Sequence, residues 1–167
     1  MKPFSVRPAR PDEFSRIGEI TVAAYSGIEP DTGNPVVDEY FEELRNVAQR
    51  ARDAEVLVAA GEDDQVLGAV TLVLDPNSPL AEFDEPGAAS FRMLAVAPEA
   101  QSKGVGKLLA VYCVDRARAA GAEVVLIHSR PTMIAARDMY MKMGFVRHAA
   151  IDFEVDDIKL DGFRLKL

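Results

Sequence analysis

A mixed α/β domain is the fold class that this sequence predicts, and three observations predict it. Short runs rich in β-branched residues alternate along the chain with apolar patterns of helical period. The 167 residues fit one domain, and a chain of this length buries enough apolar surface to fold without disulfides or metals. Neither a repeat nor a low-complexity tract divides the chain. We therefore predict a single domain over residues 1–167, with helices packed against a sheet.

The N-terminal third predicts a strand followed by two helices. Residues 4–7 form the strand, and residues 11–25 form a helix that begins with proline and has acidic residues in its first turn. Residues 26–35 contain two glycines and two prolines, which favour a loop. Residues 36–52 then place apolar residues at helical spacing and predict a second helix.

An antiparallel hairpin comes next, followed by a long polar loop. Residues 55–60 and 66–74 predict two strands joined by a turn over 61–65. The loop over 75–87 has three prolines and, after Asp75, three further acids, and loops of this length in compact domains are often functional. We expect it to cap a substrate. The three further acids are Glu82, Asp84 and Glu85.

The rest of the chain alternates strand and helix and ends in two strands. Pro98, Gly121 and Gly144 mark where elements stop, because proline interrupts a strand ladder and glycine suits the left-handed end of a helix. The predicted elements are a strand over 90–97, a helix over 104–120, a strand over 123–129, a helix over 132–143, and strands over 145–153 and 163–167.

Composition and charge exclude several classes of protein. The formal net charge of -8 opposes nonspecific binding to nucleic acid and suits a cationic acceptor better. No apolar run is long enough to span a bilayer, and residues 1–10 lack the apolar core of a secretory signal. Cys113, the single cysteine, gives no sign of an oxidising compartment and is predicted to be a buried, inert thiol. We predict a cytoplasmic protein without nucleic-acid or membrane partners.

The most informative segment follows the strand that ends near Val96. The first turn of a helix leaves backbone N–H groups unpaired and carries a partial positive charge, which suits an anion. Gly104 and Gly106 have no Cβ to block phosphate oxygens, and Lys103 and Lys107 add ion pairing. Gly-x-Gly alone is also a common turn element. This segment predicts a site for a pyrophosphate.

Two familiar phosphate-binding patterns are excluded at this segment. A dinucleotide fingerprint requires a third small residue where Leu109 stands. The phosphate loop of kinases and ATPases requires serine or threonine after its lysine, whereas Leu108 follows Lys107.

A first motif resembles that of a known family. Gln101-x-x-Gly104-x-Gly106, after a strand that contains Leu94-Ala-Val96, resembles the Gln/Arg-x-x-Gly-x-Gly/Ala signature of GNAT N-acetyltransferases. The predicted order of elements is also similar to the order in that family over nearly all residues.

A second motif agrees with the first. The stretch Ala136-x-x-x-Tyr140-x-x-x-Gly144-Phe145 resembles the later GNAT pattern, in which a helix presents a tyrosine toward the thioester and ends in Gly-Phe. Without the family, a core aromatic whose hydroxyl is satisfied is the favoured interpretation of Tyr140.

The resemblance implies a fold and a cofactor site. The fold is a GNAT-like central, mostly antiparallel sheet of six to seven strands with one splayed strand pair, flanked by about four helices. The co-substrate is acetyl-CoA, and no metal ion is expected. The cofactor-binding residues that the resemblance implies are Leu94, Ala95, Val96, Gln101, Ser102, Lys103, Gly104, Val105, Gly106 and Lys107.

The resemblance also implies a direct transfer. A backbone N–H within residues 94–96 would polarise the thioester carbonyl, and Tyr140 would be the catalytic residue that donates to the departing thiolate. Many relatives place a glutamate on the fourth strand as general base, but residues 90–96 contain no carboxylate. Glu29, Glu82, His128 or a water chain remain as alternatives. Met133 stands where many relatives have an asparagine that helps hold the cofactor.

Two functions follow as hypotheses. The first is an N-acetyltransferase that moves an acetyl group from acetyl-CoA to a primary amine of a small molecule or a protein; the second is a catalytically silent acyl-CoA-binding module. The intact glycine signature and Tyr140 favour the first, and the missing strand carboxylate favours the second. The sequence does not identify the acceptor or the preferred acyl chain. A homodimer is an open alternative, since similar proteins are often dimers and no apolar stripe marks an interface.

Overall fold

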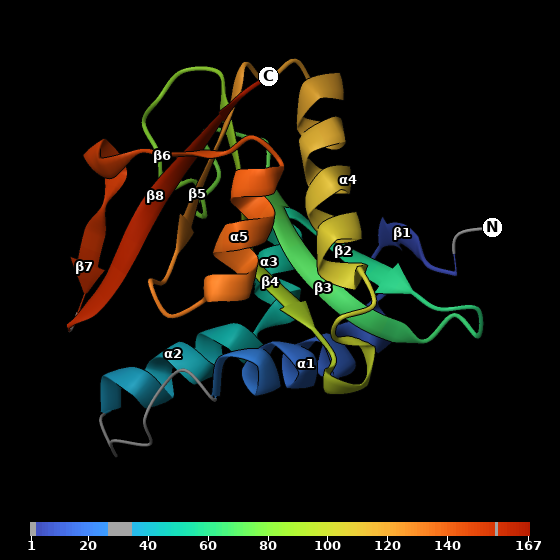
Figure 1. Ribbon diagram of the computed structural model, residues 1–167. Coiled ribbons are helices and arrows are strands. Elements are labelled where there is room, and N and C mark those ends of the chain that lie inside the picture. The colour runs from blue at the N-terminus through green and yellow to red at the C-terminus, as the bar shows by residue number, and fades with distance from the viewer. Residues whose placement is uncertain (1–2, 27–34, 156) are drawn as a thin grey trace.

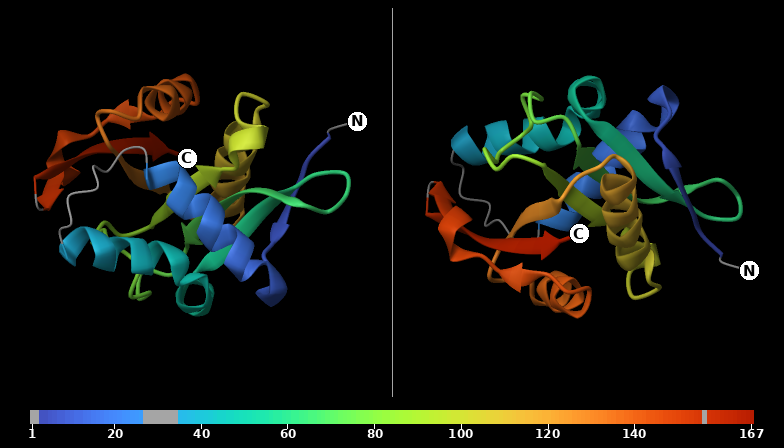
Figure 2. Two further views of the ribbon diagram at one scale, coloured as in Figure 1. Left: turned by 90° about the horizontal axis from the view of Figure 1, so that it is seen from below. Right: turned by 90° about the horizontal axis from the view of Figure 1, so that it is seen from above.

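The computed structural model describes residues 3–26, 35–155 and 157–167 of the chain. One sheet forms the middle layer; α1, α2 and α3 lie on one of its faces and α4 and α5 on the other (Figures 1 and 2). The helices are α1 (Phe14–Ser26), α2 (Pro35–Arg45), α3 (Val47–Asp53), α4 (Val105–Ala119) and α5 (Ile134–Lys142), with short 3-10 helices η1 (Pro11–Glu13), η2 (Pro98–Ala100) and η3 (Ala149–Ile151).

The sheet has the order β1-β2-β3-β4-β5-β8-β6, with β7 paired to β8. Its strands are β1 (Ser5–Pro8), β2 (Glu55–Ala60), β3 (Val66–Val73), β4 (Ala88–Val96), β5 (Val124–Ser129), β6 (Val146–Arg147), β7 (Phe153–Val155) and β8 (Ile158–Lys166). Every pairing is antiparallel except that between β4 and β5. The predicted mixed fold with a mostly antiparallel sheet is confirmed.

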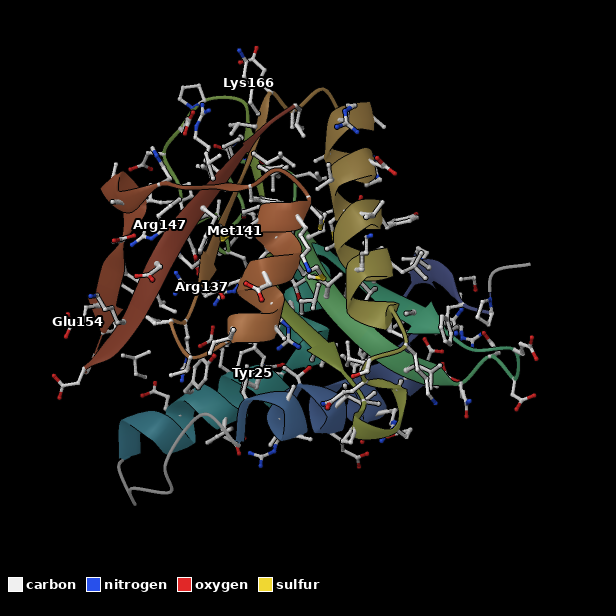
Figure 3. The ribbon with its side chains drawn as sticks, viewed as in Figure 1. Tyr25, Arg137, Met141, Arg147, Glu154 and Lys166 are labelled. Carbon is white, nitrogen blue, oxygen red and sulfur yellow. The ribbon has the colours of Figure 1, made fainter. Side chains whose placement is uncertain are left out.

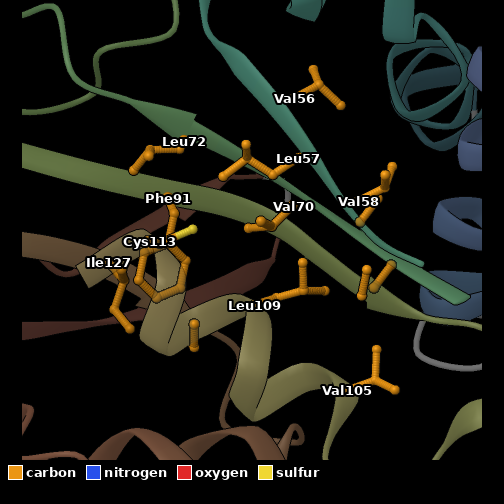
Figure 4. Close-up of a cluster of buried hydrophobic side chains, with 14 of the residues drawn as sticks. Val56, Leu57, Val58, Val70, Leu72, Phe91, Val105, Leu109, Cys113 and Ile127 are labelled. Carbon is orange, nitrogen blue, oxygen red and sulfur yellow. The ribbon is translucent and has the colours of Figure 1, made fainter. Parts of the chain in front are cut away.

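The core lies where β2, β3 and β4 pack against α4 (Figure 4). Every residue of β3 is buried, because helices cover both faces of the sheet at its centre. Leu109 and Cys113 reach this core from α4 and are fully buried. Burial raises the pKa of the Cys113 thiol, so the prediction of an inert, buried cysteine is confirmed.

The predicted second helix is divided into α2 and α3 at Asn46. Arg50, which is only 3% exposed, donates through Nη1 to the carbonyl oxygens of Glu43 (2.8 Å) and Leu44 (3.0 Å), so it caps the end of α2. The Asn46 side chain accepts from the N–H of Gln49 and starts α3. Side-chain hydrogen bonds therefore cap both the end of α2 and the start of α3.

The strand predicted over 145–153 is wrong in its middle. The structure has the two-residue β6, then η3, and then β7. The chain turns there because His148 N–H donates to the carbonyl oxygen of Gly162 (2.8 Å) and Arg147 Nη2 donates to Asp152 Oδ2 (2.6 Å). β8 begins at Ile158, five residues before the predicted start of the last strand, where its first residues pair with β7.

No helix in the described parts of the chain is long and apolar enough to cross a bilayer. The predicted loop over 26–35, with Glu29 in it, lies almost entirely outside the described residues.

Candidate active site

The central feature of the site is the separation of two neighbouring strands. β4 and β5 pair at only three positions, Ala88 with Val124 through Ser90 with Leu126, and beyond Ser90 they have no further paired residues. The ends of both strands therefore border a gap. This is the splayed strand pair that the resemblance implied.

A bulge in β4 lies beside this gap. Ala95 pairs with Ala69 and Arg92 pairs with Thr71, which leaves Met93 and Leu94 opposite a single residue of β3. Met93 has a φ of 54°, a left-handed conformation that is rare for a non-glycine residue in a strand. The irregular backbone is at Met93 and Leu94, whereas Ala95 and Val96 stay paired with β3. On the side of β4 that faces the gap, none of these residues is paired with β5.

The segment after β4 forms a cradle of backbone N–H groups. Ser102 (φ 63°) and Gly104 (φ 84°) adopt left-handed conformations, and Gly104 is the N-cap of α4 without a side-chain cap. Among the described residues, no group accepts a hydrogen bond from the N–H groups of residues 102–107. Alternating right- and left-handed residues before a helix N-terminus make a concave site for an anion.

The side chains around the cradle leave it open. A Cβ on Gly104 would meet no atom within 4 Å, and a Cβ on Gly106 would meet only ordinary contacts at 3.5 and 3.6 Å. Lys103 and Lys107 are exposed and form no ion pair with a described residue. Val105 differs, because its side chain is buried against the sheet and only its backbone faces the cradle.

Tyr140 of α5 is buried and packs against two aromatic rings. It is 6% exposed, and its ring centroid lies 5.9 Å from that of Phe91 and 5.7 Å from that of Phe145. Burial raises the pKa of the Tyr140 hydroxyl, and the neighbouring Tyr25 and Cys113 add to the effect. The hydroxyl therefore keeps its proton at neutral pH and is a hydrogen-bond donor rather than a base.

On the face of β5 opposite to Tyr140, three charged side chains form a cluster. Arg92 Nη1 lies 2.7 Å from Glu82 Oε1, and Glu82 Oε2 lies 3.3 Å from Nδ1 of His128. His128 Nε2 lies 2.6 Å from the carbonyl oxygen of Ile151. Both ring nitrogens of His128 therefore face acceptors, which favours the doubly protonated imidazolium.

The contacts within this cluster shift the pKa values of both candidate bases in directions that disfavour general-base catalysis. Burial alone would lower the pKa of His128, but the bonds to Glu82 and Ile151 outweigh it and raise the pKa. Burial alone would raise the pKa of Glu82, but His128 and the Arg92 charge lower it. The structure thus brings two of the predicted bases together. His128 is held in its protonated form, and the lowered pKa of Glu82 makes its carboxylate a weaker base.

A cavity of about 600 Å³ opens beside this cluster. Leu126 and His128 form its floor, whereas Ile127 between them points to the core that contains Tyr140. The remaining walls come from the loop over 82–85, η3 and β7: Glu82, Phe83, Asp84, Glu85, Ile151 and Phe153. Glu85 is paired with Arg164 at 2.6 Å, so the acids of this loop are less available for a cationic ligand than the sequence indicated.

Sequence reasoning missed Ile151 and Phe153, because it placed them in a continuous strand. It also missed Ser129 at the end of β5, whose Oγ is buried without a hydrogen-bond partner among the described residues. Met133 is the N-cap of α5 and makes no side-chain cap bond, as expected for an apolar residue there. In the described residues, no group of three or more His, Cys, Asp or Glu side chains is arranged to hold a metal ion.

Comparison with known proteins identifies the family. A model of the acetyltransferase (GNAT) family matches residues 15–145. The chain belongs to the GNAT family of acetyltransferases. Members of this family use acetyl-CoA, which accounts for an anion cradle beside a splayed strand pair. No curated protein sequence matches the chain.

Solved GNAT structures share the fold over nearly the whole chain. A GNAT acetyltransferase from Staphylococcus aureus superposes with a TM-score of 0.75 at 12% identity, covering 98% of this chain and 99% of the other. A putative acetyltransferase from Salmonella typhimurium, solved with its cofactor acetyl-CoA, gives 0.67 at 20% identity, covering 99% and 95%.

A ribosomal-protein-alanine N-acetyltransferase from Brucella melitensis gives a TM-score of 0.69 at 19% identity, covering 98% of this chain and 99% of the other. At these identities the three structures establish the fold and leave the acceptor of this GNAT protein open.

Proposed function

We propose that this GNAT protein is an N-acetyltransferase that moves the acetyl group of acetyl-CoA to a primary amine of a small molecule or a protein. The observation that carries the proposal is the run of six unpaired N–H groups over 102–107, next to the gap between β4 and β5. We further propose that residues 1–167 form one GNAT-type domain, which is supported by a single sheet from β1 to β8. A cytoplasmic setting is supported by the single, buried, unpaired cysteine.

The residues present fit the diphosphate of acetyl-CoA. The cradle supplies N–H donors and the partial positive charge of the α4 N-terminus, and Gly104 leaves space where a side chain would stand. Ser102, Lys103, Gly104, Val105, Gly106 and Lys107 would contact the diphosphate, with Gln101 at the entry to the loop. The exposed Lys103 and Lys107 add charge at the rim.

The bulged part of β4 would hold the arm that carries the thioester. The backbone groups of Leu94, Ala95 and Val96 border the gap, because β5 offers no pairing partner there. When bound, the cofactor supplies an activated acetyl group. A backbone N–H fixed at the bulge would stabilise negative charge on the thioester oxygen as the amine attacks.

Tyr140 would serve the leaving group. As the C–N bond forms and the C–S bond breaks, its hydroxyl donates to the departing sulfur, and the raised pKa keeps that hydroxyl protonated. The proton of the attacking amine leaves through water, because His128 is held as an imidazolium and the lowered pKa of Glu82 makes its carboxylate a weak base. Transfer is direct, without a covalent intermediate on the protein.

The cofactor site is tested by calorimetric titration with acetyl-CoA. We expect Gly104→Glu to weaken binding by about 100-fold or more, since it puts a negative charge against the diphosphate. Gly121→Glu is the matched control, because Gly121 ends the same helix with a φ of 87°, close to the 84° of Gly104, and has equally open space around its Cβ. A parent chain that does not bind acetyl-CoA would contradict the proposal.

A catalytically silent acyl-CoA-binding module is the second candidate, and the engaged states of Glu82 and His128 favour it. Tyr140→Phe separates the two functions. For an enzyme, we expect kcat with an accepted amine to fall about 100-fold while the affinity for acetyl-CoA is retained. If no primary amine is acetylated by a parent chain that binds acetyl-CoA, the silent module is correct.

A further inference from the structure

The Ser129 hydroxyl is a buried polar group without a partner. Ser129 is 4% exposed, and its Oγ is the one buried side-chain nitrogen or oxygen in the described chain that makes no hydrogen bond. Burying a hydroxyl without a partner costs free energy that folding has to offset. Such a group is retained at a cost to stability, which indicates a ligand that completes its hydrogen bond.

Its position along β5 places it at the gap. Ser90 pairs with Leu126, so an unbroken register would bring Met93 opposite Ser129, but the two strands have separated before that level. Met93 is the left-handed residue of the β4 bulge. Ser129 thus ends β5 at the level where the opposite strand exposes its irregular backbone.

Its side chain lies on the face that α5 covers. Ser129 is the direct cross-strand partner of Asp161, and opposed residues in an antiparallel pair share a face. Arg137 of α5 reaches Asp161 Oδ2 at 2.8 Å, and Arg147 reaches Asp161 Oδ1 at 3.1 Å; both arginines lie alongside β8 (Figure 3). Tyr140 follows Arg137 by less than one helical turn. The hydroxyl therefore lies on the Tyr140 side of the sheet.

We infer that the Ser129 hydroxyl binds an amide of the pantetheine arm of acetyl-CoA in the gap between β4 and β5. The inference rests on the proposed function and adds a cofactor-binding residue outside both sequence motifs. A hydroxyl suits this ligand, because it both donates and accepts and each amide offers an N–H and a carbonyl. It also supplies a polar contact at the end of β5, where the apolar Met133 at the start of α5 offers none.

Two ligands test this inference in the absence of any acceptor. CoA carries both the diphosphate and the pantetheine arm, whereas ADP carries the diphosphate alone. We expect Ser129→Ala to weaken CoA binding about threefold to tenfold and to leave ADP binding unchanged, as for the loss of one hydrogen bond. Ser90→Ala is the matched control, a buried serine at the last paired position of the neighbouring strand, and should change neither affinity.

Thermal unfolding of the ligand-free protein gives a second readout. Alanine removes an unpaired buried oxygen, so Ser129→Ala should unfold at the same temperature as the parent or higher. A lower unfolding temperature would mean that the hydroxyl has a partner within the protein and would overturn the inference. So would equal CoA affinities of parent and variant, or equal losses for CoA and ADP. A parent that binds neither ligand would instead refute the proposed function.

Discussion

On one side of the gap between β4 and β5, the chain offers backbone N–H groups from one short segment, residues 102–107. On the other side, the cavity is walled by side chains from the 82–85 loop, β5, η3 and β7. The first site depends on conformation and open space, and the second depends on side chains that long-range packing brings together. At residues 102–107, adding a side chain should therefore do more harm than removing one. The cavity should instead be affected by removal of a lining side chain and by movement of the segments that form its walls.

Gly162→Ala has the largest expected effect on the cavity side. A Cβ on Gly162 would overlap the Ile151 side chain and lie 2.6 Å from the carbonyl oxygen of His148, so η3 would have to move. We expect a loss of about 1–3 kcal/mol, seen as a fall in Tm of about 2–12 °C. Gly106→Ala, on the cofactor side, makes only ordinary contacts and should leave Tm unchanged or slightly higher. Equal Tm values for both variants would contradict this difference between the cavity and the cofactor side.

Glu82→Gln has a smaller and pH-dependent effect. Folding raises the pKa of His128 and lowers that of Glu82, so their mutual stabilisation is complete between the usual values of about 4.3 and about 6.5. It is lost as pH rises through the raised His128 value or falls through the lowered Glu82 value. Because the Glu82 side chain is 38% exposed, we expect a difference from the parent of about 0.5–1 kcal/mol at pH 5.5, decreasing toward pH 8.5.

Thermal unfolding at both pH values measures this difference. Glu85→Gln is the control, because Glu85 pairs with an arginine, Arg164, and not with a histidine. A destabilisation by Glu82→Gln that grows with pH would contradict the imidazolium form of His128.

Lys103→Ala has the smallest expected effect. An exposed lysine at the rim of a backbone cradle contributes about 0.2–1 kcal/mol, so acetyl-CoA affinity should fall no more than about fivefold, and less in 0.5 M salt. Titration at two salt concentrations measures this, with Lys159→Ala on β8 as a distant control. A loss of 100-fold or more would show that a side chain, and not the backbone, dominates the cradle.

The contrast between local conformation and long-range packing also explains how much of the fold and of the site could be predicted from the sequence. The hairpin of β2 and β3, the limits of α4 and the left-handed Gly121 after it all follow from signals within a few residues. The break at Asn46 also had a local signal, since asparagine is a preferred N-cap, but the residue that fixes it, Arg50, acts through tertiary packing.

The turn that separates β6 from β7 had no local signal. The turn after β6 depends on Gly162, which is 14 residues from His148 in sequence and accepts its N–H. Such a contact changes a strand into a turn. Neither the composition of the segment nor its alternation of apolar and polar residues predicts this change. The walls of the cavity that come from η3 and β7 were missed for this reason.

The three-residue pairing between β4 and β5 has a consequence for the local stability of the protein. This seam is the narrowest link between β1–β4 and the later strands, so local opening there separates two halves of the sheet. A cofactor held across the seam acts as a staple, and the free energy of unfolding then rises with the logarithm of its concentration. Bound acetyl-CoA would therefore make local opening of the sheet rarer as its concentration rises.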